Sequence, residues 1–236
     1  MKGRPRKDTS TKQEKLTISQ AFMRVTVALP QAPSIEDPLP THLTFFVDSR
    51  FTTAQRNRIT RLITGVMSQW ARYYINRDNG VNSPLKQCTA RYARFNLAPE
   101  WFEDKIANGN VAVDVMMDGL TRAFIANGFG RAFRAQIMYP SPGTTPPKAI
   151  RGANASDPDR NSLSVIINPK TLSRIDLGDT TLIGSLLHAW LHRIGYRHPA
   201  ELYTSYFIGE AAMCLMHGNT SKQSGVPDSR LTAFLD

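Results

Sequence analysis

Apolar residues between positions 53 and 74 recur every three or four residues, the spacing that places them on one face of a helix. Thr52 precedes this run and Gln55 follows three residues later, which is the pattern of a capping box at a helix start. The sequence therefore predicts a long amphipathic helix over residues 53–74. Its apolar face consists of Ile59, Leu62, Ile63, Val66, Met67 and Trp70.

Short apolar or alternating runs predict strands elsewhere in the chain. The predicted strands are residues 23–29, 42–48, 132–139 and 163–169, with 87–95 as a further candidate. Because strands and helices are interspersed, the sequence predicts an α+β fold in which helices pack on a mixed sheet.

Three intervening segments are less regular. Residues 99–107 predict a short helix that ends at Asn108 and Gly109. Residues 111–127 fit either one helix or a strand followed by a helix. Residues 140–160 are rich in Pro, Gly and Ser and are predicted to form a loop.

A second amphipathic helix is predicted to begin near residue 180, where Asp179 or Thr180 can cap its N-terminus. His188 and His192 fall together on the side of this helix opposite its apolar stripe, one turn apart. Two imidazoles placed in this way can converge on one metal ion. The apolar stripe comprises Leu182, Ile183, Leu186, Leu187, Trp190, Leu191 and Ile194.

Gly195 is predicted to end this helix, because glycine tolerates the left-handed conformation that a helix C-terminus needs. The chain can then turn and bring His198 to the same ion. Three neutral imidazoles at about 2.0–2.1 Å form a good zinc site, and the fourth position is left for water, as in a catalytic site. The sequence therefore predicts one zinc ion held by His188, His192 and His198.

Residues 188–198 resemble the extended zinc signature of the metzincin clan of metallopeptidases, His-Glu-x-x-His-x-x-Gly-x-x-His. Every fixed position matches except one, because Ala189 stands where the family has glutamate. The resemblance implies a zincin-like fold with a twisted mixed sheet, packed helices and a smaller subdomain after the zinc helix. It also implies a zinc-dependent metalloendopeptidase, which hydrolyses peptide bonds with a zinc-activated water and takes a peptide or protein as substrate.

Ala189 changes what this resemblance implies for activity. In the family, the glutamate takes a proton from the zinc-bound water and passes it to the leaving amine. Its loss typically lowers the rate by about 10²–10⁴-fold, so this chain is predicted to be inactive or nearly so. Because the rest of the site is intact, deliberate replacement of Glu by Ala is the favoured explanation. The alternative is a natural pseudopeptidase, or a zinc-stabilised module that binds protein or nucleic acid.

The resemblance also implies a methionine beneath the zinc site, and Met216 is the expected residue, with Met213 as the alternate. Tyr203 and Tyr206 are candidates to stabilise the oxyanion of a tetrahedral intermediate. Ordinary core packing is the competing interpretation for all four side chains. The strand at 163–168 is expected to border the cleft and to pair with extended substrate.

The chain carries 29 Lys and Arg against 19 Asp and Glu, a net charge of +10, which favours an acidic partner such as an acidic peptide, nucleic acid or anionic lipid. No zinc-finger spacing or aromatic-rich RNA-binding signature strengthens the nucleic-acid interpretation. Residues 1–22 are predicted to be a basic, flexible arm, and residues 23–236 a metzincin-like domain.

No apolar segment follows the basic arm, and no run of 18 apolar residues exists, so neither a signal peptide nor a membrane span is predicted. Cys88 and Cys214 are the only cysteines, too few for a disulfide framework. They are predicted to be reduced thiols, with a single bridge between them as the alternative. The cytoplasm is the expected compartment, and secretion stays open.

Overall fold

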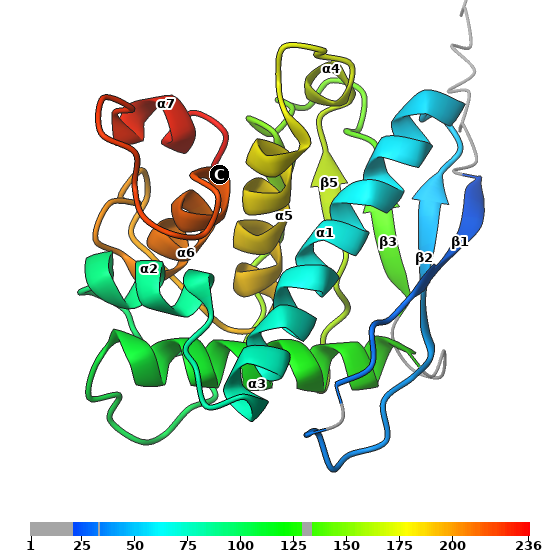
Figure 1. The fold of residues 1–236 in the computed structure, drawn as a ribbon. Coiled ribbons are helices and arrows are strands. Elements are labelled where there is room, and N and C mark those ends of the chain that lie inside the picture. The colour runs from blue at the N-terminus through cyan, green and yellow to red at the C-terminus, as the bar shows by residue number, and fades with distance from the viewer. Residues whose placement is uncertain (1–20, 33, 129–133) are drawn as a thin grey trace, which may run out of the picture.

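The computed structural model describes residues 21–32, 34–128 and 134–236. Within these ranges the chain is an α+β protein with a mixed five-stranded sheet and seven helices (Figure 1). The predicted basic arm lies outside them, apart from its last two residues, of which Phe22 begins the first strand. In chain order the elements are β1 (Phe22–Ala28), β2 (His42–Asp48), α1 (Thr53–Asp78), α2 (Pro84–Tyr92), α3 (Gly109–Gly128), β3 (Ala135–Met138), β4 (Ile150–Arg151), β5 (Val165–Ile167), α4 (Pro169–Leu172), α5 (Asp179–Arg193), α6 (Phe207–Met216) and α7 (Asp228–Thr232).

The sheet has the strand order β1-β2-β3-β5-β4. The three inner strands, β2, β3 and β5, run parallel, and β1 and β4 pair antiparallel at the two edges. Because β5 is paired on both sides, it has no free edge for an extended substrate, and the expectation for residues 163–168 was wrong. The short strand β4 is the edge on that side, and it packs against α5.

Helix α1 confirms the amphipathic pattern and continues four residues beyond the predicted end. Thr52 and Gln55 form the expected capping box, with each side chain accepting a hydrogen bond from the other residue's backbone N–H. The apolar face of α1 is fully buried, and Trp70 on it donates a hydrogen bond to Thr121 of α3 at 2.9 Å. This helix crosses in front of the sheet and packs against α5 (Figure 1).

The strand predicted at 87–95 is wrong, because most of this segment belongs to helix α2. Ser83 caps the helix by accepting from the backbone N–H of Lys86 at 3.2 Å, and Pro84 occupies the first turn, where its missing N–H costs nothing. Leu85 and Cys88, three residues apart, are buried together on one face. The start signal at Ser83-Pro84 outweighs the weak alternation that follows it.

The short helix predicted at 99–107 is also absent from the described structure, where this segment is irregular. Asn108 begins a helix instead of ending one. Its side-chain oxygen accepts from the backbone N–H groups of Asn110 and Val111, at 2.9 and 3.2 Å. Residues 111–127 then lie within the single helix α3, which decides between the two alternatives.

Strands β2, β3 and β5 confirm the predicted segments 42–48, 132–139 and 163–169, although β3 and β5 are shorter than expected and residues 132 and 133 lie outside the described ranges. The core between sheet and helices centres on Trp190 of α5. Its ring stacks with Phe45 of β2 at 6.1 Å and meets the edge of Phe124 of α3 at 6.0 Å. The apolar side of α5 is thereby fixed against the sheet.

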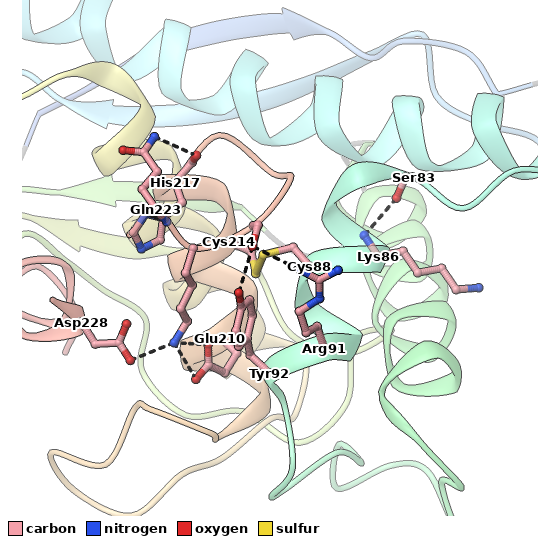
Figure 2. The surroundings of a disulfide bond; sticks show 12 residues. Ser83, Lys86, Cys88, Arg91, Tyr92, Glu210, Cys214, His217, Gln223 and Asp228 are labelled. Carbon is pink, nitrogen blue, oxygen red and sulfur yellow. Dashed lines mark hydrogen bonds and ion pairs between the residues drawn. A yellow bond between two sulfur atoms is a disulfide. The ribbon is translucent and has the colours of Figure 1, made fainter. Parts of the chain in front are cut away.

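Cys88 of α2 and Cys214 of α6 form a disulfide with their Cα atoms 5.9 Å apart, so the prediction of two reduced thiols was wrong and the alternative is confirmed (Figure 2). The pairing follows from α2 being a helix, which turns Cys88 inward against α6. Beside the bond, Lys222 makes ion pairs with buried Glu210 and with Asp228, each at 2.8 Å. Such a bond is compatible with either expected compartment.

Among the helices in the described ranges, none has the length and apolar character needed to cross a bilayer.

Candidate metal centre

The three predicted ligands come from α5 and from the loop that follows it. Helix α5 begins at Asp179 with Gly178 as its cap residue, so neither Asp179 nor Thr180 caps it. Asp179 instead accepts hydrogen bonds from Arg58 and Arg61 of α1, at 2.8 and 2.9 Å, which ties the start of α5 to α1.

Gly195 ends the helix as predicted, with φ of +103°. Two backbone hydrogen bonds close the last turn of the helix. Gly195 N–H donates to His192 O at 3.4 Å, and Tyr196 N–H donates to Leu191 O at 3.0 Å. A side chain at Gly195 would also meet Trp101, because its Cβ would lie 2.9 Å from Cδ1 of that ring. The glycine therefore permits both the backbone turn and the close packing that return His198 toward α5.

The three histidines converge as a triangle of ring nitrogens. The Nε2 atoms of His188, His192 and His198 lie 3.2, 3.2 and 3.3 Å apart. A tetrahedral ion with ligands at about 2.0–2.1 Å requires nitrogens about 3.3 Å apart. The observed spacing is thus that of three ligands on one ion, and the group can hold a metal ion.

The other nitrogen of each ring faces a backbone carbonyl. Nδ1 of His188 lies 3.4 Å from Ile208 O, that of His192 lies 3.2 Å from Tyr196 O, and that of His198 lies 2.7 Å from Pro199 O. A carbonyl only accepts, so the protons of neutral His192 and His198 belong on Nδ1, whereas His188 can carry its proton on either nitrogen because its Nε2 also lies 2.9 Å from the main-chain oxygen of Asp236. With the proton of His188 on Nδ1 as well, each Nε2 presents a lone pair to the centre of the triangle, which is the form that binds a metal.

Burial keeps these rings neutral. Burial, together with the neighbouring His192 and His198, lowers the pKa of His188 well below its ordinary value, and burial together with His198 lowers the pKa of His192 to about 4. His198 is half-buried, and burial lowers its pKa as well. Because α6 and the last residues of the chain cover the histidine-bearing side of α5, His188 and His192 are only 1% and 8% exposed.

Ala189 offers no group that can accept a proton, and it is completely buried. Gly152, which directly follows β4, lies so close to it that a Cβ on Gly152 would be 2.0 Å from the carbonyl oxygen of Ala189. The backbone of α5 at the position that the resemblance assigns to a glutamate therefore packs against the residue after β4, and the Ala189 methyl group is buried.

Tyr203 is brought to the site and Tyr206 is not. The ring of Tyr203 lies 4.9 Å from that of His198 and 5.7 Å from that of His188. Its hydroxyl donates to the carbonyl of Leu235 at 3.0 Å and accepts from Nζ of Lys148 at 3.2 Å. Tyr206 precedes α6 and packs against Phe95 at 5.4 Å.

Helix α6 carries both candidate methionines, so neither lies in a turn. Met213 is fully buried in a small cluster with Tyr203 and Leu235, and Met216 packs against the outside of that cluster. Met216 also approaches Gly184, one turn before His188 on α5. Of the two, Met213 shares a cluster with the tyrosine that touches the histidines.

The comparisons place the chain in no known group. No protein-family model matches it, and neither a curated protein nor a solved structure matches it. The three histidines and the mixed sheet with its helices fit a zincin-like fold, and the interpretation of the site rests on the residues of this chain.

The arginines next to the ligands are engaged within the chain. Arg193 donates to the carbonyls of Ser162 and Ala153, at 2.7 and 2.8 Å. Arg197 pairs with Glu100 at 2.6 Å. These bonds give the charges a structural role, and the prediction of an acidic or nucleic-acid partner stays a prediction.

Two parts of the surroundings were not predicted from the sequence: Lys148, which bonds to Tyr203, and residues 234–236, of which Asp236 contacts His188. The signal for the latter was the apolar pair Phe234 and Leu235 in an otherwise polar segment. That pattern shows burial but not the element it is buried against.

Proposed function

We propose that this chain binds one zinc ion through His188, His192 and His198 and holds it without hydrolysing peptide bonds. The observation that carries the proposal is the triangle of Nε2 atoms 3.2–3.3 Å apart, with every Nδ1 facing a backbone carbonyl. Without a cation, three lone pairs in a buried site would repel one another. A zinc ion suits an all-imidazole set with tetrahedral spacing.

Three described groups near the triangle, Tyr203, Lys148 and Glu210, are not free to act as a general base. Burial raises the pKa of the Tyr203 hydroxyl, and bonds to Glu201 and Tyr203 raise that of Lys148 against the effect of desolvation, so both keep their protons at neutral pH. Glu210, the buried carboxylate of α6, accepts from the backbone N–H of Ser205 at 2.6 Å and pairs with Lys222. These groups do not replace the glutamate, which supports a role in binding over a role in hydrolysis.

The burial of Ala189 supports the pseudopeptidase interpretation over deliberate replacement. A glutamate at this position needs room for its carboxylate beside the ion, whereas Ala189 has no solvent-exposed surface. In this proposal the zinc cross-links α5 to the loop at His198 and stabilises the packing of the C-terminal third of the chain.

A first experiment tests the metal. Purified protein is stripped with a chelator, dialysed against zinc and analysed for zinc per chain, alongside His192→Ala and a matched control, His42→Ala. His42 is exposed at the start of β2. We expect about one zinc in the parent and in His42→Ala and little in His192→Ala, since losing one of three ligands weakens the site. Equal zinc in all three proteins would refute the proposal.

The second candidate is a peptidase whose base has been replaced. The Gly195 turn and the order of ligands favour it, because they reproduce the signature of a catalytic site. Restoring the base in Ala189→Glu separates the two candidates. Chelator-sensitive cleavage of a mixed protein substrate by this variant, and not by the parent, would establish the peptidase, whereas we expect neither protein to cleave.

A further inference from the structure

Residues 234–236 return to α5, where the last of them contacts His188. Leu235 is completely buried in the cluster that contains Tyr203 and Met213. The carbonyl of Phe234 accepts from the hydroxyl of Ser185 on α5 at 2.8 Å, and the carbonyl of Leu235 accepts from the hydroxyl of Tyr203. Two successive residues of this segment, Phe234 and Leu235, are therefore anchored to residues next to the histidines.

Asp236 makes the contact that matters most. Its main-chain oxygen lies 2.9 Å from Nε2 of His188, and its side-chain oxygen accepts from the backbone N–H of Lys148 at 2.9 Å. The segment thus places an oxygen beside the nitrogen triangle.

In the metal-free ring, a proton on Nε2 would make this contact an ordinary hydrogen bond. When Nε2 of His188 binds a metal ion, the proton of the ring lies on Nδ1, which faces the carbonyl of Ile208, so Nε2 and the Asp236 oxygen are then both acceptors. Two acceptors 2.9 Å apart repel each other unless a cation lies beside both of them. Three imidazole nitrogens and this oxygen would form a complete four-ligand set.

We propose that the main-chain oxygen of Asp236 is the fourth ligand of the ion, and that residues 234–236 occupy the side of the site on which water or a peptide would bind. This inference rests on the proposed zinc site. The contact of Leu235 supports the proposal. Its carbonyl accepts the hydrogen bond from the Tyr203 hydroxyl, which is therefore not free to donate to a bound peptide or an oxyanion. The ion is then closed to external ligands until the segment leaves.

The consequence is competition between the segment and any external ligand. The apparent association constant for an external ligand equals its intrinsic value multiplied by the fraction of molecules in which the segment is displaced. Removing the segment should therefore strengthen binding without changing the three histidines.

The test uses Co²⁺ in place of zinc, because its visible absorption reports the ligands around it, and acetohydroxamate as the external ligand. The full chain is compared with a chain lacking residues 234–236, with Leu235→Ala, and with Arg230→Ala as control. Leu235→Ala keeps residues 234–236 but removes the buried side chain that holds them in place. This variant therefore tests the proposal if the shortened chain does not fold. Arg230 is exposed on α7 in the same part of the chain.

We expect acetohydroxamate to bind the shortened chain at least about tenfold more tightly than the full chain, with Leu235→Ala in between and Arg230→Ala unchanged. The Co²⁺ spectrum should also change on shortening, before any hydroxamate is added. Equal affinity and equal spectra in the full chain, the shortened chain and Leu235→Ala would overturn the role of the segment while leaving the zinc site intact. Failure of the full chain to bind Co²⁺ at all would overturn the zinc site itself.

Discussion

Ala189 is the residue that decides what a metal ion can do in this protein. It is completely buried, so a longer side chain at this position has to displace its neighbours. We predict that Ala189→Glu lowers the free energy of unfolding by about 1–3 kcal/mol through overpacking. Urea unfolding followed by circular dichroism measures the change.

The matched control is Ala54→Glu, the same substitution at an exposed position in the first turn of α1. A negative charge there is favoured by the helix dipole, so its effect should stay within about 0.5 kcal/mol. If Ala189→Glu is as stable as this control, then the fold has space for a glutamate at this position. Deliberate replacement of a glutamate by alanine would then be the better explanation.

The histidines predict a pH dependence of the metal-free protein. In the unfolded chain they titrate near about 6.5, whereas burial lowers the folded pKa of His192 to about 4. Below pH 6.5 the unfolded state therefore binds more protons, and stability falls as the pH falls from about 6.5 toward 4. The loss from His192 alone is roughly 3 kcal/mol.

Urea unfolding at a series of pH values, in the presence of chelator, measures this dependence. His192→Leu should flatten it, because the residue that titrates differently in the two states is gone. The exposed His42 provides the control, and His42→Ala should leave the slope unchanged. A slope between pH 6.5 and 4 that is the same in His192→Leu and in the parent would contradict the assignment.

The ligands were predictable from the sequence because their arrangement is local. Spacing of four residues places His188 and His192 one turn apart on any helix, and Gly195 marks the turn that follows. Gly152 contacts the backbone of Ala189, and Tyr203 donates a hydrogen bond to Leu235. Each of these contacts joins residues more than 30 positions apart in the sequence. No periodicity in the sequence records such contacts.

At the scale of helices and strands, the Cys88–Cys214 disulfide joins α2 to α6 across 126 residues (Figure 2). Cross-linking a long loop restricts the unfolded chain, and removal of such a bond typically costs about 2–5 kcal/mol. We predict a loss of this size for the double variant Cys88→Ala/Cys214→Ala, measured as a shift in the urea unfolding midpoint.

Reductant provides the control for this prediction. It should destabilise the parent protein by a similar amount and have no effect on the double variant. A parent protein that is insensitive to reductant, with two titratable thiols after unfolding, would show that the bond is not formed in solution.

Elements with a strong local signal were predicted well, and those that depend on partners were not. Helix α1 and strand β2 each carry a clear apolar pattern and, for α1, a capping box. In contrast, α2 was mistaken for a strand because its nine residues contain too few turns to show a helical period. Strand β4 has two residues and is defined by its pairing with β5. Two residues are too few to show the alternation of apolar and polar positions that predicts a strand.

At the scale of the whole molecule, a bound zinc ion should raise the thermal stability. An ion that binds the folded state alone adds about 2.7 kcal/mol when its free concentration is 100 times the dissociation constant. We predict that chelation lowers the melting temperature and that zinc restores it. Differential scanning calorimetry of the parent, with His198→Ala as a variant lacking one ligand, measures the shift.

In this experiment His198→Ala should melt at the same temperature with zinc and with chelator. A parent protein whose melting temperature does not respond to zinc would mean that the ion contributes nothing to the fold. The residual metal content after chelation is measured in the same samples, so that incomplete stripping is not mistaken for insensitivity.

The disulfide has a further consequence for the integrity of the chain. The bond closes a covalent ring that contains all three histidines, whereas residues 234–236 lie outside it. Residues 141–146 are exposed and lie within this ring, where a protease can reach them. A single cut there releases no fragment and yields a two-chain molecule, which migrates as one species on a gel until a reductant separates its halves.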